Sequence, residues 1–344
     1  RPGPTTQDTA FMVESGATPR DYGLRVQSHP VLLVTSPLKM RTAKNLQLSF
    51  SGDLLETVSL HNDDKILDQW TQEQIVLKQS LKLYDTEPWQ LSRKIYDNAD
   101  QTGLRYVAGL DISYSDDGQG ISGLFVFEMN NADSRMMTLV YKDVDSEFIK
   151  MDQPYVPGFL AYREGPPLLR KLEKLRQTKP EIYPQLLLID GNGILHPHKF
   201  GFACFLGVKS DTPSLGVSKK LYQVLGLEKS EAHRRRIKEE LKKRGDYFDL
   251  MSNEERPEKV AICYRSTDEA PNPVYVSIGH KMSWETCVWL MERMVAKCRI
   301  PEPIRYADLT TREVIRELGG YAAKSQKPSQ LTTTKSTDKT QENQ

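Results

Sequence analysis

Two aspartates occupy positions where a carboxylate is costly unless it has a function. Asp111 follows the apolar residues 107–110 in a segment that predicts a β-strand, and Asp190 directly ends the apolar run of residues 186–189. A buried carboxylate is unfavourable unless it is paired or bound to a metal. Either aspartate alone is just as typical of a turn or a cap. Together on neighbouring strands, they indicate a site.

The residues around Asp190 and a third carboxylate indicate which chemistry this site performs. Gly191 and Gly193, in the sequence Asp-Gly-Asn-Gly, let the backbone turn sharply and approach a ligand closely. Glu164 lies earlier in the chain, in a predicted helix, and its carboxylate can supply a third oxygen. Oxygen ligands of this kind suit Mg²⁺ or Mn²⁺, which in turn hold phosphate oxygens and a nucleophilic water. We therefore expect a divalent-metal site formed by Asp111, Glu164 and Asp190.

The elements that must position these carboxylates follow a recognisable order. Residues 106–114, 120–129 and 136–143 predict three antiparallel strands, with turns at Asp117-Gly118 and Asn130-Asn131. Alternating helices and strands are expected after this meander, and one helix before it. The expected helices are residues 70–83, 159–176, 231–244 and 283–296, and the expected strands are residues 185–189, 213–217 and 274–278. A meander followed by α/β units predicts an RNase H-like fold, in which helices flank a mixed central sheet.

The chain divides into three expected parts. Residues 1–65 contain no chemical motif and are interpreted as an N-terminal extension of unclear fold, and residues 66–318 as the catalytic domain. Residues 319–344 form a polar tail that has too few apolar residues to offset the entropy cost of ordering it. We expect this tail to be disordered.

Composition bounds the cellular setting and the partners. The 47 lysines and arginines nearly balance the 46 aspartates and glutamates, so any surface for nucleic acid must be local. The basic helix at residues 231–244 is the main local candidate, although a solvated helix face is its simplest interpretation. The four cysteines form no C-x-x-C pair, which fits a reducing compartment. No secretory signal or membrane-spanning run is visible, so we expect an intracellular protein of the cytoplasm, nucleus or nucleolus.

Five motifs in one order resemble endonuclease V. They are GLDISY around Asp111, PYVPGFLAYREGP from Pro154, DGNGILHPHKFGFACFLGV from Asp190, GVSKKL from Gly216 and SIGHKMS from Ser277. Several ordered motifs, which together span residues 70–316, make a chance match improbable. The resemblance implies a nuclease that recognises inosine or deoxyinosine. It also implies hydrolysis of the second phosphodiester bond on the 3′ side, leaving 3′-hydroxyl and 5′-phosphate ends.

The resemblance implies a role for each catalytic candidate. Asp111, Glu164 and Asp190 correspond to the metal carboxylates, with Mg²⁺ as the cofactor and Mn²⁺ as a substitute. Lys219 corresponds to a lysine near the scissile phosphate, and His280 to a histidine beside the attacking water. Without the resemblance, a histidine at a strand end fits a structural role better.

A second group of residues is expected to hold the base. Tyr155 lies between Pro154 and Pro157, whose rigidity suits an aromatic wedge beside a displaced base, whereas packing in the core is the alternative. His196 and His198 cannot form a helical metal pair, because Pro197 separates them, so His196 is given an accessory role. By resemblance, the pocket that excludes guanine is lined by Gly158, Leu160, Gly191 and Gly193. Tyr222 departs from the family, which has an aliphatic residue after Leu221.

The expected partner is single-stranded RNA that contains inosine, with deoxyinosine-containing DNA as a second substrate. The long segment with the basic helix looks like that of eukaryotic members, which favour inosine in RNA, and we expect it to follow the nucleic-acid backbone. The protein is expected to act as a monomer without membrane contact. Two alternatives stay open: a base-tolerant RNase H-like nuclease, and a non-catalytic binder of inosine-containing nucleic acid.

Overall fold

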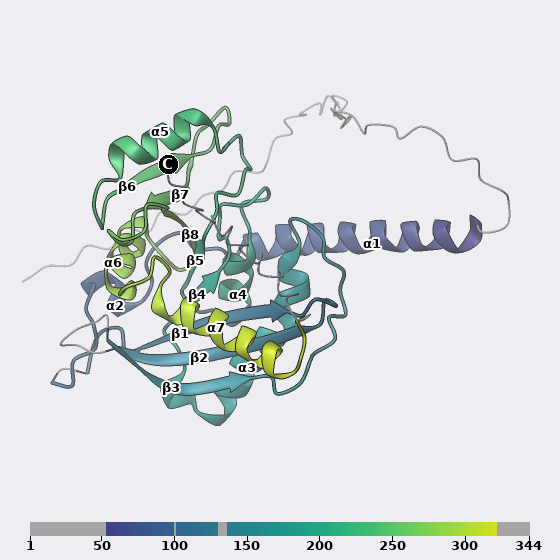
Figure 1. Cartoon of the computed structure of the whole chain (residues 1–344), viewed down its shortest axis with the longest axis horizontal. Helices are drawn as coiled ribbons and strands as arrows, with labels where there is room; N and C mark the ends of the chain where they lie inside the picture. The colour runs from purple at the N-terminus through teal and green to yellow at the C-terminus, as the bar shows by residue number, and fades with distance from the viewer. Residues whose placement is uncertain (1–52, 100, 130–135, 322–344) are drawn as a thin grey trace, which may run out of the picture. The chain divides into compact units, whose positions relative to one another are not determined.

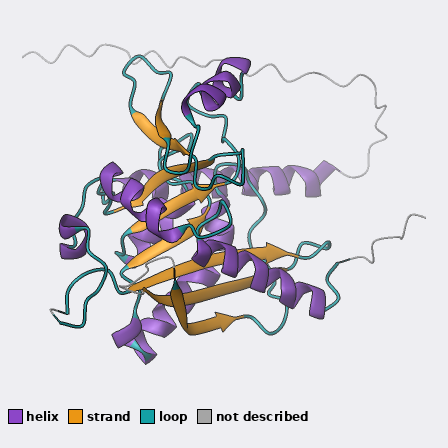
Figure 2. Ribbon diagram, turned by 60° about the vertical axis from the view of Figure 1, so that its left-hand side comes forward, coloured by secondary structure: helices purple, strands orange, loops and turns teal. Residues whose placement is uncertain are grey.

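The computed structural model describes residues 53–99, 101–129 and 136–321. An eight-stranded mixed sheet forms the centre of this part, in the order β3-β2-β1-β4-β5-β8-β7-β6 (Figure 1). Helices pack on both faces of the sheet (Figure 2). The predicted α/β class and RNase H-like arrangement are confirmed. Residues 1–52 and most of the predicted polar tail lie outside the described residues.

The predicted antiparallel meander is present. It consists of β1 (Tyr106–Tyr114), β2 (Gly120–Met129) and β3 (Met137–Val144), with Asp111 paired to Gly123 across β1 and β2. The turn at Asp117-Gly118 is also present, and Gly118 has a φ of 82°, which favours glycine. The turn predicted at residues 130–131 lies outside the described residues.

Parallel pairing in the middle of the sheet brings the two aspartates to one edge. The strand β4 (Leu186–Asp190) pairs in parallel with β1 on one side and with β5 (Ser214–Ser218) on the other. The register places Leu110 beside Ile189, and Asp190 beside Val217. Because the carboxyl ends of parallel strands meet at the same sheet edge, Asp111, Asp190 and the residue after Ser218 lie near one another.

The remaining strands extend the sheet beyond β5. They are β8 (Val274–His280), β7 (Lys259–Tyr264) and β6 (Tyr247–Met251), all antiparallel to their neighbours. Neither β6 nor β7 was predicted, although β8 was.

One face of β1 and β2 is covered by α7 (Glu302–Glu317). Phe125 and Phe127 of β2 both make edge contacts with Tyr306 of this helix, so the alternate residues of β2 face the other side. The approach is close at Gly109, where a Cβ atom would lie 2.0 Å from the carbonyl oxygen of Pro303. Only glycine at this position lets α7 lie so near the sheet.

The other helices complete the described part of the chain. In chain order they are α1 (Asp53–Lys78), α2 (Pro88–Ser92), α3 (Leu160–Thr178), α4 (Phe202–Ser210), α5 (Glu231–Glu240) and α6 (Trp284–Met294), with a 3₁₀ turn at Pro180–Ile182. The predicted helices at residues 159–176 and 283–296 are confirmed. The first helix was expected at residue 70, whereas α1 begins at Asp53 and so crosses the expected domain boundary. No helix in the described residues is long and apolar enough to cross a membrane.

Candidate active site

Three aspartates meet where β4 ends beside the middle of β1. One carboxylate oxygen from each of Asp111, Asp190 and Asp308 lies within 4.8 Å of the others. Asp111 accepts hydrogen bonds from Thr311 Oγ1 at 2.8 Å and from Ser113 Oγ at 3.1 Å. Three converging carboxylates are a hard-oxygen donor set of the kind that Mg²⁺ and Mn²⁺ prefer. The residues present therefore fit a divalent metal.

Burial and mutual repulsion make this cluster costly without a cation. Burial raises the pKa of Asp111 to about 6, and the charges of Asp190 and Asp308 add to the rise. The hydrogen bonds from Thr311 and Ser113 oppose it only in part. An arrangement that disfavours its own charged form is typical of a site built to receive a cation.

Glu164 lies beside this cluster rather than within it. It is on the second turn of α3, its side chain is buried, and Tyr114 Oη donates a hydrogen bond to Glu164 Oε1 at 2.9 Å. Burial raises the pKa of Glu164 to about 7, with smaller contributions from the charges of Asp111 and Asp190. The structure thus brings Glu164 within electrostatic reach of both aspartates, but the group of carboxylates close enough to share a metal contains Asp308 and not Glu164.

Asp308 is the site residue that the sequence analysis missed. It lies on α7, which was not predicted, and it also forms an ion pair of 2.8 Å with Arg312. The available signal was an amphipathic pattern: Ile304, Ala307 and Thr311 are buried on the face that also carries Asp308. A carboxylate on the core face of a helix is as costly as one on a buried strand, and so is an equally good indicator of a site.

Lys219 is the cation that bridges two carboxylates of the site. It directly follows β5, whose parallel pairing with β4 brings it to Asp190. Its Nζ atom lies 2.7 Å from Asp190 Oδ2 and 3.6 Å from Asp308 Oδ2. Burial disfavours the ammonium charge, but the attraction of Asp190 and Asp308 outweighs burial and raises the pKa of Lys219. Lys219 is therefore charged and lies directly beside the cluster.

The structure does not bring His280 to the carboxylates. His280 ends β8, which is antiparallel to β5, and it pairs with Ser214, whereas Asp190 is level with Val217. Three strand residues separate these levels by about 10 Å along the sheet. The predicted place of His280 beside the attacking water is therefore wrong, because the strand direction puts its end at the opposite edge of the sheet.

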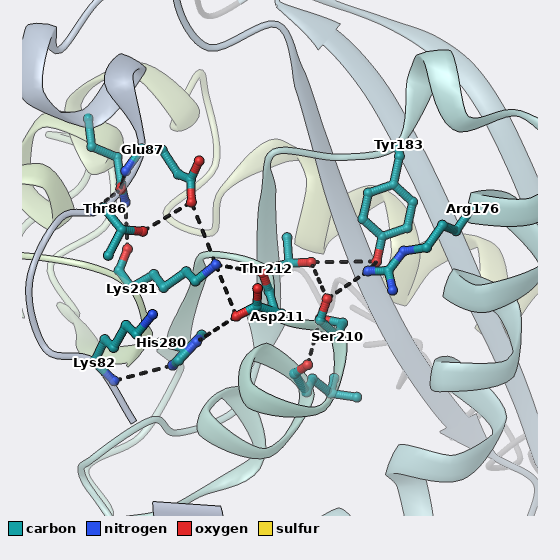
Figure 3. Close-up of polar contacts among 12 residues, drawn as sticks. Lys82, Thr86, Glu87, Arg176, Tyr183, Ser210, Asp211, Thr212, His280 and Lys281 are labelled. Atoms are coloured by element: carbon teal, nitrogen blue, oxygen red, sulfur yellow. Dashed lines mark hydrogen bonds and ion pairs between the residues drawn. The ribbon is translucent and has the colours of Figure 1, made fainter. Parts of the chain in front are cut away.

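His280 instead belongs to a polar network in which its own ring is buried and Asp211 is exposed (Figure 3). Its Nδ1 accepts a hydrogen bond of 3.3 Å from the backbone N–H of Lys82, and its Nε2 lies 3.6 Å from Asp211 Oδ1. Asp211 also forms an ion pair of 3.0 Å with Lys281. Burial lowers the pKa of His280, and the nearby carboxylate of Asp211 offsets this lowering only in part. These contacts hold the segment between α1 and α2 against the end of β8.

A cavity of about 260 Å³ opens beside Asp190 and is the candidate base pocket. Of the residues predicted for substrate binding, six line it: Tyr155, Pro157, Gly158, Leu160, Gly191 and His196. Pro154 is exposed and precedes Tyr155 without lining the cavity. Gly193 is also outside the lining, which corrects the prediction. A Cβ atom there would lie 1.9 Å from the carbonyl oxygen of Ile278, so this glycine allows close contact between the loop and β8.

Tyr155 and Tyr222 are two aromatic side chains of this pocket. Tyr155 is 68% exposed, which excludes packing in the core as its role. Tyr222, the departure from the family pattern, lines the same cavity. A pocket with an exposed aromatic ring at its wall is suited to holding a base that has left its stack.

The wall that carries Gly158 is held by α1, a contribution the sequence did not predict. Gln74 is buried on this helix, and its Nε2 donates a hydrogen bond of 3.2 Å to the carbonyl oxygen of Gly158. The Oε1 atom of Gln74 lies 2.5 Å from His198 Nδ1. His196 also interacts with the backbone of Gly158, and burial, followed by the effect of His198, lowers the pKa of His196 to about 4. A neutral His196 thus supports the pocket.

An RNase H-like sheet with clustered carboxylates at the carboxyl ends of its central strands defines the class of this protein: it is a nuclease. The chain belongs to the endonuclease V family, whose model matches residues 89–309. Members of this family are metal-dependent nucleases, and the three aspartates could bind the metal.

Relatives and solved structures agree with this assignment. Human endonuclease V is 39% identical over 259 residues, which cover 74% of this chain and 85% of the human one. The mouse protein is 37% identical, with 78% and 75% covered. The crystal structure of the human protein matches with a TM-score of 0.66 and 40% identity, over 74% of this chain and 99% of that one. A Ciona intestinalis endonuclease V, in complex with a 24mer DNA containing an inosine followed by a ribo-adenosine, matches with a TM-score of 0.62 and 29% identity, over 74% and 99%.

Proposed function

We propose that this chain cleaves nucleic acid at inosine, by metal-dependent hydrolysis of the second phosphodiester bond on the 3′ side. The products are a 3′-hydroxyl and a 5′-phosphate end. The observation that carries this proposal is the joining of two features at Asp190: the carboxylate cluster with its lysine, and the base-sized pocket that begins at Gly191.

Three carboxylates would hold the metal in this mechanism. Asp111, Asp190 and Asp308 would bind Mg²⁺, or Mn²⁺ in its place, and Glu164, whose pKa responds to the charges of Asp111 and Asp190, would orient a water beside them. When bound, the metal polarises the scissile phosphate and lowers the pKa of the attacking water. The positive charge of Lys219 stabilises the negative charge that develops on the phosphate oxygens in the transition state.

The pocket selects the base. Tyr155 acts as the wedge beside the displaced inosine, and Gly158, Leu160 and Gly191 lie against its base. Hypoxanthine lacks the exocyclic amine of guanine, so a pocket closed at that position excludes guanine by size. Tyr222 supplies a further aromatic surface for stacking.

Single-stranded RNA is the preferred substrate in this proposal. The scissile phosphate is the same in RNA and DNA, so the preference must come from contacts with 2′-hydroxyl groups. Support comes from the ribo-adenosine that follows inosine in the ligand of the Ciona protein.

The test uses matched oligonucleotides that carry inosine or guanosine at one position, each as single-stranded RNA and as DNA, with and without Mg²⁺. We expect metal-dependent cleavage at inosine alone, faster in RNA. Equal cleavage at guanosine would instead support a base-tolerant nuclease, and faster cleavage of DNA would reverse the preference. Asp111→Ala should abolish cleavage and keep substrate binding. Binding without any cleavage by the unaltered chain would indicate a non-catalytic binder.

A further inference from the structure

A second hollow, of about 480 Å³, opens next to Lys219 and is strongly basic. Six lysines and arginines line it: Lys219, Lys220, Lys229, Arg234, Lys238 and Arg299. Among the described residues that line this basic hollow, none carries a carboxylate. Since the whole chain has a formal net charge of only +1, this concentration of positive charge is local.

Most of these cations are available to a ligand. Lys229 and Lys238 are exposed, and neither forms an ion pair with any residue of the described part of the chain; the same holds for Lys220. Arg234 has an ion pair of 3.2 Å with Glu231, which is itself exposed and weakly held. Unpaired lysines on one concave surface attract an anion rather than stabilise the fold.

The structure divides the basic segment at residues 231–244 into two kinds of residue. Arg236 is bound to Glu240 at 2.6 Å and lies 4.0 Å from the ring of Phe248, and Arg244 donates hydrogen bonds to the carbonyl oxygens of Glu292 and Val295. These arginines are used within the fold. The face of α5 that carries Arg234 and Lys238 turns toward the basic hollow instead, so the helix is more than a solvated surface.

The walls of the basic hollow are held in place by other contacts. His233 Nε2 and Tyr275 Oη lie 3.0 Å apart, which joins α5 to β8. Arg299 donates a hydrogen bond of 3.1 Å to the carbonyl oxygen of Pro273. Leu221 and Ile237 supply the apolar part of the lining. The cations therefore have a defined arrangement around a preformed cavity.

The basic hollow is connected to the catalytic cluster and to the base pocket through a few residues. Lys219 lines the hollow and bonds Asp190, which directly precedes Gly191 of the base pocket. Leu221 lines the hollow and its neighbour Tyr222 lines the pocket. The segment of residues 219–222 is thus a wall shared by the two cavities, with the cluster at its start.

We propose that the basic hollow binds the phosphates of the substrate strand on the 3′ side of the cut. This inference rests on the proposed function, in which inosine occupies the base pocket and the broken bond lies 3′ to it. The nucleic-acid strand that continues past Lys219 is then the downstream strand, and the first anion-binding surface it meets is the basic hollow. Efficient cleavage therefore requires several nucleotides beyond the scissile bond.

The experiment compares two inosine-containing RNAs with the same 5′ part. One ends a single nucleotide beyond the scissile bond, and the other continues for about six more, within the site size of a single-strand groove. The variants are Lys229→Glu and Lys238→Glu. Lys142→Glu is the control, because Lys142 is an exposed lysine on β3 at the far edge of the sheet.

We expect each variant to raise KM for the long RNA by about 3- to 10-fold and to change KM for the short RNA by less than about 2-fold. The dependence of binding on salt should flatten by about 0.7 in log–log slope for each phosphate that the variant no longer neutralises. The unaltered chain should prefer the long RNA, and the control should retain that preference. Equal effects on both RNAs, or none on either, would overturn the proposal.

A separate measurement distinguishes this inference from the proposed function. The downstream segment alone, as a fluorescent oligonucleotide without inosine, is titrated with the unaltered chain and with Lys229→Glu. Weaker binding by the variant supports the basic hollow as a strand site even if no inosine cleavage is found. Cleavage at inosine without this difference would support the proposed function and reject the hollow.

Discussion

The Nζ atom of Lys219 lies 2.7 Å from Oδ2 of Asp190, so the cation of the site binds one of the carboxylates that would hold the metal. Asp308 adds a second carboxylate 3.6 Å from the same nitrogen. Unit charges 4 Å apart interact by about 4 kcal/mol at an effective dielectric constant of 20. Lys219 and a divalent metal therefore compete for the same negative charge.

Replacing Lys219 by methionine should separate its two effects. We expect kcat to fall by about 100-fold, because the developing charge on the phosphate loses a donor. Mn²⁺ should bind more tightly, by about 10-fold, because the carboxylates lose a competing cation. Calorimetric titration with Mn²⁺ and single-turnover cleavage measure the two quantities. Weaker Mn²⁺ binding by the variant would show that Lys219 organises the site more than it competes with the metal.

Asp308→Asn tests the residue that sequence analysis missed. We expect loss of about 1000-fold in kcat and weaker Mn²⁺ binding, because one of three converging carboxylates becomes neutral. Without metal, we expect little change in the melting temperature, since relief of the repulsion among the aspartates is offset by loss of the ion pairs of Asp308 with Arg312 and Lys219. Glu313→Gln is the matched control, because Glu313 is exposed on the same helix. Unchanged cleavage by Asp308→Asn would remove Asp308 from the site.

His280→Gln tests whether His280 is structural. The network around His280 holds residues 82–87 against β8, and loss of a buried hydrogen bond costs about 1–2 kcal/mol in the free energy of unfolding. We expect that loss in denaturant unfolding, with kcat of the folded enzyme within about 2-fold of the original value, because the nearest catalytic carboxylate is about 10 Å away along the sheet. A large drop in kcat with unchanged stability would restore a catalytic role.

The contrast between His280 and Asp190 shows which parts of the site the sequence predicts. Asp190 could be placed because its strand is a continuous apolar run, and a parallel strand has one possible carboxyl edge. His280 was placed beside the attacking water by the resemblance alone, whereas its position at a strand end favoured a structural role. Nothing in the local sequence shows that β8 is antiparallel to β5, which puts His280 at the opposite edge. Strand direction depends on pairing between distant segments.

Residues supplied by helices were the hardest to predict. Asp308 and Gln74 enter the site from α7 and α1, at either end of the described chain. The amphipathic pattern of α7 marks Asp308 as a carboxylate on a buried helix face, but it does not show which site the helix reaches. Each residue becomes part of the site only when its helix packs against the sheet or against the loop of Gly158. By contrast, Tyr155 was identified from the prolines that flank it, since their restriction of the backbone is itself local.

Tyr155→Ala should reduce cleavage without affecting the fold. Tyr155 is 68% exposed, so its removal leaves the core intact. Stacking of a base on an aromatic side chain contributes about 1–3 kcal/mol, and we therefore expect kcat/KM for inosine-containing RNA to fall by about 5- to 100-fold. Tyr84→Ala, at another exposed tyrosine, should leave cleavage unchanged. Equal melting temperatures with equal activity in both variants would exclude Tyr155 as a wedge.

The buried His196 should make the protein sensitive to acid. Its pKa in the folded protein is about 4, below the ordinary value of 6.5, mainly because of burial. Between these two pH values the unfolded chain takes up a proton that the folded protein does not, so the free energy of unfolding falls as pH decreases from 6.5 towards 4. The loss approaches about 3 kcal/mol. His196→Gln removes this titration, and we expect its stability to fall less steeply over the same range. Denaturant unfolding of both proteins at several pH values measures the difference, and parallel curves would show that His196 does not titrate as its burial requires.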